Sequence, residues 1–199
     1  MFSLFLDILY YEIYLFYNKM KKYSLILLIV FSLYNNLEAA LNFDWDVYYT
    51  ELVDSHNLIR LRHGVPPLIK DKKLEKYAQE TANDSLFAGT FKNGQVNING
   101  EYIGQNIYIG IGNPHTGKYL TDYWYSENVY YNYYNGKSQN GAPINHFAQI
   151  VWKKTERIGC GIAVGRWRIY KESYFICCYY SPGGNLPGLY LKNIQRSVY

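Results

Sequence analysis

Two segments toward the C-terminus constrain the fold of this chain more than any others. The first is INHFAQIVWKKTERIGC, residues 144–160, and the second is FICCYYSPGGN, residues 175–185. Within and beside them, Ile158–Val164 and Tyr174–Tyr180 are rich in Ile, Val and aromatic residues, and a turn bearing Lys and Arg separates them. This pattern predicts a β-hairpin with cysteine on both of its strands.

The chain has three cysteines, Cys160, Cys177 and Cys178, so at most one internal disulfide bond can form. Successive residues of a strand point to opposite faces, so Cys177 and Cys178 cannot both face Cys160. The residues alone leave open which of them pairs, and they also leave open three reduced thiols in a cytosolic protein. No CxxC spacing occurs, which argues against a thiolate zinc site.

Four motifs occur in a defined order along the chain. They are HNLIRLRHGVPPL at 56–68, GQNI at 104–107, HFAQIVW at 146–152, and a Cys-x-Tyr-x-Pro-x-Gly-Asn pattern that begins at Cys178. In this order they resemble the CAP superfamily of cysteine-rich secretory, antigen 5 and pathogenesis-related-1 proteins, whose domain is also called SCP. The resemblance runs from about Trp45 to Asn193, and venom allergen-like proteins are among the family members that the chain resembles.

The resemblance implies an α+β fold, a three-layer α-β-α sandwich with a central antiparallel sheet. It also implies a disulfide bond between Cys160 and Cys178. We expect a secreted, single-domain protein that is extracellular and monomeric.

The periodicity of the chain agrees with such a sandwich. A helix is expected over 45–61, and Gly64 and the prolines at 66 and 67 end it. Asp71 is expected to cap a second helix, which ends before Gly89 because its apolar residues recur at helical spacing up to that point. Two further helices are expected around 119–127 and 144–151, and strands are expected at 102–109 and within 158–180.

In the family, a central cleft holds two histidines and two glutamates, a set able to bind a divalent ion. His146 and Glu127 match two of these positions, whereas Gln105 stands in place of a glutamate and Asn93 falls near the remaining histidine position. Amides bind transition metals more weakly than carboxylate or imidazole, so we expect these four side chains to form a hydrogen-bonded polar cluster. Zinc held by His146 and Glu127 is the alternative, and no other cofactor is expected.

The resemblance favours binding over catalysis. We expect a non-enzymatic protein that binds a sterol, a fatty acid or a protein partner outside the cell. The expected lipid loop is VYYNYY at 129–134, which contains Tyr130, Tyr131, Tyr133 and Tyr134. The competing interpretation is that these are ordinary surface residues of a chain with 24 tyrosines.

A hydrolase is the alternative function. It would use His146 and Glu127, either with a divalent metal or with Ser126 or Ser138 as nucleophile. No GxSxG or HExxH motif is present, so the sequence gives this alternative little support.

The N-terminal region has the composition of a secretion signal. Met20 and the two lysines after it precede an apolar run over 23–34, and Ala39–Ala40 offers a cleavage point. Asp7 and Glu12 interrupt the preceding run, so neither run is a clean membrane span. We expect residues 1–39 to be a signal region with translation starting at Met20, and residues 40–199 to be one CAP domain. Residues 1–19 would then be a gene-model extension or a type II anchor.

The formal net charge of +4 is small, and the basic residues are scattered along the sequence, which argues against nucleic-acid binding. Asn83, in the tripeptide NDS, is the only N-glycosylation acceptor in the sequence.

Overall fold

The computed structural model describes residues 11–12, 14–15, 17, 19–21, 23–24, 26–31, 43–91, 96–167 and 170–198. The chain divides into two compact units, 1–43 and 44–199. In the first unit, the described residues between 11 and 31 are helical. Among all the described residues, no helix has both the length and the apolar character needed to cross a membrane.

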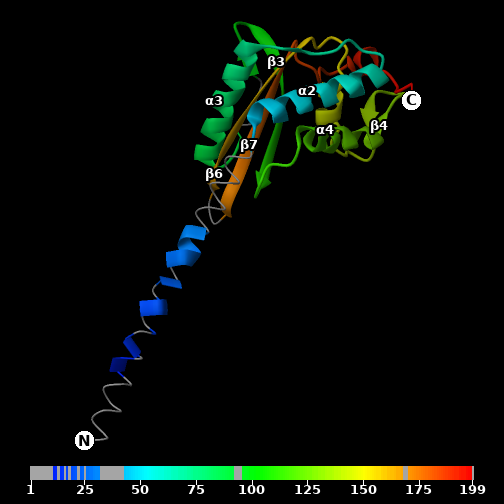
Figure 1. The fold of residues 1–199 in the computed structure, drawn as a ribbon. Helices are drawn as coiled ribbons and strands as arrows, with labels where there is room; N and C mark the ends of the chain where they lie inside the picture. Colours follow the sequence, from blue (N-terminus) through cyan, green and yellow to red (C-terminus); the bar gives the residue numbers. More distant parts are fainter. Residues whose placement is uncertain are drawn as a thin grey trace, which may run out of the picture. The chain divides into compact units, whose positions relative to one another are not determined.

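The second unit is a three-layer α-β-α sandwich (Figure 1). Its helices are α2 (Trp45–Arg62), α3 (Lys72–Ala88), α4 (Gly117–Tyr125), the 3₁₀ helix η1 (Ser126–Tyr130), α5 (Asn145–Ile150) and α6 (Tyr190–Asn193). Its strands are β1 (Ile69–Lys70), β2 (Val96–Ile98), β3 (Glu101–Ile111), β4 (Tyr131–Asn132), β5 (Lys137–Ser138), β6 (Arg157–Trp167) and β7 (Tyr170–Ser181). Helix α3 covers one face of the main sheet, and α2, α4 and α5 lie on the other.

The main sheet has the strand order β1-β6-β7-β3-β2. Its long strands pair antiparallel, β3 with β7 and β7 with β6, whereas the short β1 pairs parallel with β6. The predicted sandwich is therefore confirmed, with one short parallel pair at the edge of a mostly antiparallel sheet.

Local sequence signals explain where the helices begin and end. The Asp71 carboxylate accepts the backbone N–H groups of Lys73 and Leu74, and Gly89 ends α3 in the left-handed conformation with φ of 69°. The expected helix over 119–127 stops earlier, because the side chains of Ser126 and Asn128 donate to carbonyl groups at the end of α4. Glu127 consequently lies in η1 rather than in α4.

The disulfide bond is the one that the family resemblance implied. Cys160 and Cys178 lie opposite each other on β6 and β7 and form a disulfide bond, with their Cα atoms 4.1 Å apart. Cys177 points to the other face, where it is buried in the cluster beneath α3 that contains Leu74 and Phe175. Burial raises the pKa of the Cys177 thiol to about 12, so this thiol is unreactive at neutral pH.

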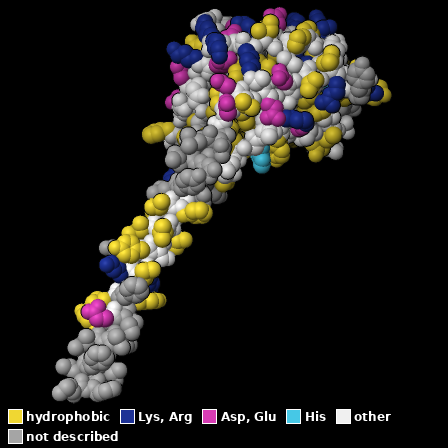
Figure 2. Space-filling view, viewed as in Figure 1, with side chains coloured by type: hydrophobic (Ala, Val, Ile, Leu, Met, Phe, Trp, Pro, Cys, Tyr) yellow, Lys and Arg dark blue, Asp and Glu magenta, His cyan; other side chains and the backbone are white. Residues whose placement is uncertain are grey.

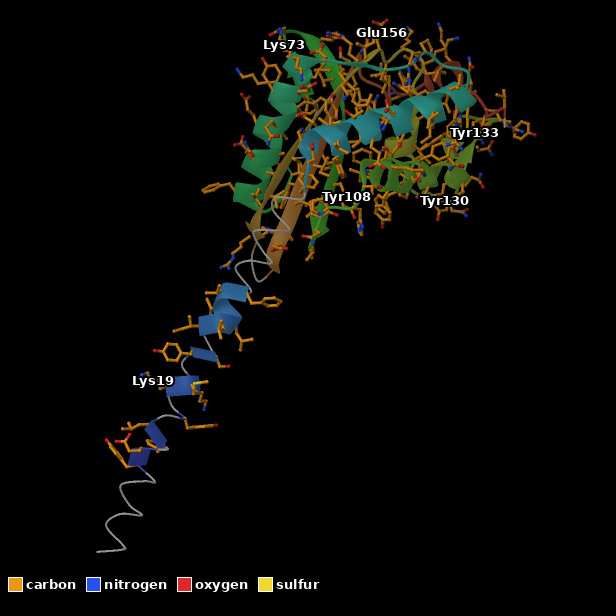
Figure 3. The ribbon with its side chains drawn as sticks, in the orientation of Figure 1. Lys19, Lys73, Tyr108, Tyr130, Tyr133 and Glu156 are labelled. Atoms are coloured by element: carbon orange, nitrogen blue, oxygen red, sulfur yellow. A yellow bond between two sulfur atoms is a disulfide. The ribbon has the colours of Figure 1, made fainter. Side chains whose placement is uncertain are left out.

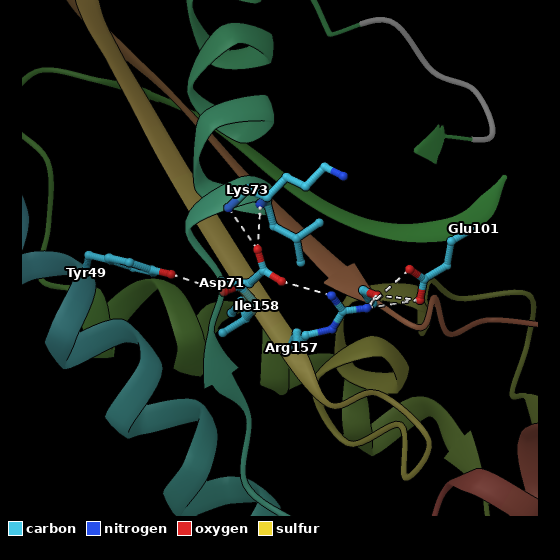
Figure 4. Close-up of polar contacts among 8 residues, drawn as sticks. Tyr49, Asp71, Lys73, Glu101, Arg157 and Ile158 are labelled. Carbon is cyan, nitrogen blue, oxygen red and sulfur yellow. Dashed lines mark hydrogen bonds and ion pairs between the residues drawn. The ribbon is translucent and has the colours of Figure 1, made fainter. Parts of the chain in front are cut away.

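A polar clamp at the start of β6 joins three parts of the fold (Figure 4). The Arg157 guanidinium donates to Asp71 at 3.0 Å and to Glu101 at 3.2 Å, so β6 is tied to the starts of α3 and β3. Nearby, the Tyr49 hydroxyl donates to the Ile158 carbonyl at 3.2 Å and ties α2 to the same strand.

Arg60 is a fully buried cation on α2. Its guanidinium donates to the carbonyl groups of Pro66, Ile150, Trp152 and Thr155, at 2.6, 2.8, 3.0 and 2.8 Å. Ile150 is the last residue of α5, where a cation also complements the helix dipole, and Trp152 and Thr155 lie in the loop after it. Burial lowers the pKa of Arg60 to about 10, so the side chain remains charged at neutral pH.

Replacing Arg60 by Met should lower the free energy of unfolding by at least about 3 kcal/mol, because three buried carbonyl groups and the part-buried one of Pro66 lose their donor. Urea denaturation measures this loss. Arg62→Met is the matched control, since Arg62 is exposed on the same helix and should change stability by less than about 0.5 kcal/mol. Equal losses in the two variants would contradict the assigned role.

Candidate functional site

The candidate site is built where η1 meets the start of α5. His146 Nδ1 lies 2.6 Å from Glu127 Oε1, and the backbone N–H groups of His146 and Phe147 donate to Glu127 Oε2 at 2.8 and 3.2 Å. Helix α5 has no side-chain cap at its own N-cap residue, Ile144. The carboxylate of Glu127 therefore serves as the missing cap and fixes the histidine ring at the same time.

The two side chains are only partly accessible. The side chain of His146 is 32% exposed and that of Glu127 is 12% exposed. The His146 ring stacks on the buried ring of Trp124, with centroids 5.9 Å apart and an interplanar angle of 11°. One face of the imidazole is thus covered.

A chain of buried hydrogen bonds connects this site to the centre of the domain. Asn106 donates through Nδ2 to the His146 carbonyl at 3.2 Å and to the Tyr180 hydroxyl at 3.4 Å. The hydroxyl in turn lies 2.9 Å from His56 Nε2, and His56 Nδ1 lies 2.9 Å from the Leu52 carbonyl. With Nδ1 as donor to that carbonyl, His56 Nε2 accepts the proton of Tyr180, so the buried imidazole is neutral.

The expected four-residue cluster is assembled only in part. Glu127 and His146 come together, but Gln105 Nε2 lies 3.5 Å from Cys177 Sγ, on the face of the sheet beneath α3. Alternation along β3 places Asn106 on the side of His146 instead, and sequence reasoning overlooked this neighbour. Asn93 lies outside the described residues.

The donors available for a metal ion are therefore few. Among the described residues, no group of three or more His, Cys, Asp or Glu side chains is placed to hold a metal ion. His63 bonds to the Gln195 carbonyl and the Tyr125 hydroxyl, and His115 is exposed beside Tyr119. One imidazole and one carboxylate do not make a tight zinc site, so the described donor set does not fit this ion.

The two serines considered as nucleophiles are engaged elsewhere. Ser126 Oγ donates to the Tyr123 carbonyl at 2.7 Å, and Ser138 Oγ donates to the Ala142 carbonyl at 2.5 Å. Neither hydroxyl has a hydrogen bond to His146 within the described part of the chain. The arrangement of nucleophile, base and orienting group that acyl transfer requires is not assembled by these residues.

The tyrosines of VYYNYY have different environments. Tyr131 is buried and packs against Phe147 and Tyr190, so it anchors the β4–β5 hairpin instead of lining its surface. Tyr130 is 45% exposed and Tyr134 is 85% exposed. Tyr133 is half-buried, with its ring 4.8 Å from that of Tyr131. The expected loop thus has a buried anchor and exposed rings, of which Tyr130 is labelled in Figure 3.

Asn83 lies on the exposed side of α3, where its side-chain oxygen accepts a hydrogen bond from Gln79 at 3.1 Å. Its position is compatible with an attached glycan, and glycosylation remains a prediction.

The domain is an α-β-α sandwich with a histidine–glutamate pair at the start of α5, and comparison with known proteins identifies its family. Residues 53–180 match the family model described as CAP, the cysteine-rich secretory protein family. The chain belongs to this family. Its relatives include proteins named as secreted, pathogenesis-related and venom proteins, and the expected extracellular location is confirmed.

Curated relatives share about a third of their aligned residues with this chain. Pathogenesis-related leaf protein 6 of Solanum lycopersicum is 34% identical over 133 residues, which cover 67% of this chain and 76% of that protein. Secreted protein RBT4 of Candida albicans is 33% identical over 142 residues, which cover 69% of this chain but only 36% of RBT4. The cysteine-rich venom protein helothermine of Heloderma horridum horridum is 31% identical, over 69% of this chain and 57% of helothermine.

Solved structures share the fold. Venom allergen-like protein 4 of Schistosoma mansoni superposes with a TM-score of 0.51 and 23% identity, covering 68% of this chain and 87% of its own. A structure of NaASP2 with Zn²⁺ gives a TM-score of 0.51 and 20% identity, covering 79% and 87%. At these identities the likeness concerns the fold alone.

Acid should destabilise this domain through its buried histidines. Burial lowers the pKa of His56 from its ordinary value of 6.5 to about 4, and burial also lowers the pKa of His63. Between pH 6.5 and about 4, the imidazole of His56 is protonated in the unfolded chain but not in the folded one. The free energy of unfolding therefore falls as the pH falls, by about 3 kcal/mol for His56.

Urea denaturation at a series of pH values between 7 and 4 measures this slope. His56→Gln should be less stable at pH 7 but should show a smaller loss toward acid, whereas His115→Gln, at an exposed histidine, should keep the slope of the unaltered protein. An unchanged slope in His56→Gln would contradict the assignment.

Proposed function

We propose that this chain is a secreted, non-enzymatic CAP protein that binds a sterol through its aromatic hairpin. The observation that carries the proposal is the hairpin itself, defined as residues 129–138. Tyr131 is buried at its base, and Tyr130 and Tyr134 project into solvent. Rings that are held rigid by such an anchor lose little conformational entropy on binding a flat apolar ligand, and their hydroxyls remain available to a sterol hydroxyl.

A fatty acid is the second lipid to consider, and a groove on α2 bears on it. The groove has a volume of about 550 Å³ and is lined by Asp54, Asn57, Leu58, Leu61, Val65 and Pro67. Asp54 would repel a fatty-acid carboxylate there. Between α2 and α4 there is little room at Gly117, where an added Cβ would lie 2.2 Å from the Tyr48 carbonyl oxygen. These contacts favour a sterol over a fatty acid, and a protein partner outside the cell remains compatible with either.

The absence of catalysis and of tightly bound zinc is part of the proposal. Glu127 is committed to capping α5 and to orienting His146, and the neighbouring serines donate to backbone carbonyls. Turnover of a broad peptide library, or submicromolar zinc binding measured by calorimetry, would contradict this view. We also propose that residues 1–39 are a signal region removed before residues 40–199 act, and N-terminal sequencing of the secreted protein tests this boundary.

Replacing both Tyr130 and Tyr134 by Ser should weaken binding of radiolabelled cholesterol about tenfold, because two exposed rings lose their contact with the ligand. Tyr131 is left intact, since its removal would disturb the core. The matched control replaces Tyr119 and Tyr123, which are exposed on α4, by Ser. If the hairpin variant bound cholesterol with the affinity of the unaltered protein and showed the same thermal transition, the hairpin would be ruled out as the sterol site.

A further inference from the structure

One end of the domain concentrates positive charge that is dispersed in the sequence. Residues 128–155 and 182–199 contain five basic residues and no Asp or Glu. These five are Lys137, Lys153, Lys154, Lys192 and Arg196. The chain as a whole has 20 basic and 16 acidic residues, so the rest of it is close to neutral. The net charge of the protein therefore belongs almost entirely to these two segments.

A backbone hydrogen bond and a ring contact join the two segments in space. The Lys153 N–H donates to the Asn193 carbonyl at 3.0 Å, so the loop after α5 lies against α6. The rings of Tyr131 and Tyr190 stack with centroids 6.5 Å apart, which holds the hairpin to the same helix. In Figure 1, β4 and the C-terminal end of the chain lie at the same end of this unit.

The last residues extend this surface across the hairpin and onto α2. The guanidinium of Arg196 lies over the rings of Tyr133 and Tyr134, 5.4 and 5.3 Å from their centroids. The Val198 N–H donates to the Arg62 carbonyl at 2.9 Å, which adds a sixth exposed cation. We name this surface the basic-aromatic end, comprising Arg62 and residues 129–138, 152–154 and 186–198.

The cations of the basic-aromatic end are available to a partner. All six are exposed, and none forms an ion pair with an acid among the described residues, in contrast to Lys72, Lys118 and Arg157. Glu127, the nearest acid in the chain to the hairpin, is already bonded to His146. Glu156 follows this loop at its border and is exposed.

Apolar side chains are exposed among these cations. They include Val129 and Tyr130, the hairpin residue Tyr134, and Leu191 and Val198 of the C-terminal segment. Figure 2 shows yellow and dark blue side chains intermingled at this end of the domain. Amphipathic rings, aliphatic side chains and lysines on one surface are typical of proteins that sit at the headgroup level of a bilayer.

We propose that the basic-aromatic end docks onto membranes that expose anionic phospholipids. The unpaired lysines and arginines would meet the headgroups, and the exposed rings and aliphatic side chains would enter the boundary of the acyl region. A nucleic acid would satisfy the cations but would leave Val129, Leu191 and Val198 in water, so the mixture of side chains favours a lipid surface. Docking requires no sterol and so goes beyond the function proposed above.

The test uses the secreted protein and sterol-free vesicles of phosphatidylcholine, with and without phosphatidylserine. Co-sedimentation should show partition onto the anionic vesicles that falls steeply with salt. Lys153→Gln with Lys154→Gln should lower the partition coefficient roughly 25-fold, at about fivefold for each cation near the surface. The fold is preserved because only the backbone of Lys153 bonds to Asn193.

The matched control is Lys73→Gln with Lys76→Gln, which makes the same change of net charge on the exposed side of α3. It should leave the partition coefficient within about twofold. Tyr134→Ser should lower partition several-fold without any change of charge. Equal partition onto neutral and anionic vesicles, equal losses in the two lysine variants, or binding to single-stranded RNA without binding to vesicles would overturn the proposal. Because no sterol is present, failure here is distinguishable from failure of cholesterol binding.

Discussion

The buried guanidinium of Arg60 is the interaction on which the functional end of this domain depends. A charge in the interior is tolerated only when its hydrogen-bonding groups are satisfied, and here backbone carbonyls from two loops and the end of α5 supply the acceptors. The same bonds fix residues 150–155, and the Lys153 amide then holds α6 and the segment after it. A single cation on α2 thus sets the position of elements that carry the site and of those that carry the basic-aromatic end.

The histidine–glutamate pair is best understood as part of this framework. Glu127 caps a short helix that has no cap of its own, and His146 is held between that carboxylate and the ring of Trp124. Its carbonyl enters a buried chain through Asn106, Tyr180 and His56. A polar network with these bonds made favours one arrangement of α2, β3, β7 and α5. We therefore propose that a ligand or a membrane binds the surface that this arrangement presents and not the histidine–glutamate pair itself.

Local signals in the sequence predicted most of the helices and strands because their physics is local, whereas the sandwich was implied by the family resemblance. Asp71 and Gly89 bound α3 as helix caps do, and the two runs of Ile, Val and aromatic residues around Cys160 and Cys178 predicted the hairpin. The site was less predictable, since a strand neighbour decides which side chain faces His146: Asn106 does, and Gln105 faces Cys177. The charge pattern was missed for a similar reason. Lys137, Lys153 and Lys192 are far apart in sequence, and only contacts between hairpin, loop and α6 bring their segments together.

Hydrogen–deuterium exchange of the protein bound to anionic vesicles containing cholesterol tests this division of roles most directly. The account predicts slower exchange in residues 129–138 and 189–198 on binding. The amides of α5 and of residues 124–127 should change little, because Glu127 already bonds to the first amides of α5 and Arg60 bonds to the carbonyl at its end. Slower exchange confined to α5 and to residues 124–127, with the hairpin and the C-terminal segment unaffected, would contradict it and would return the function to the cleft around His146.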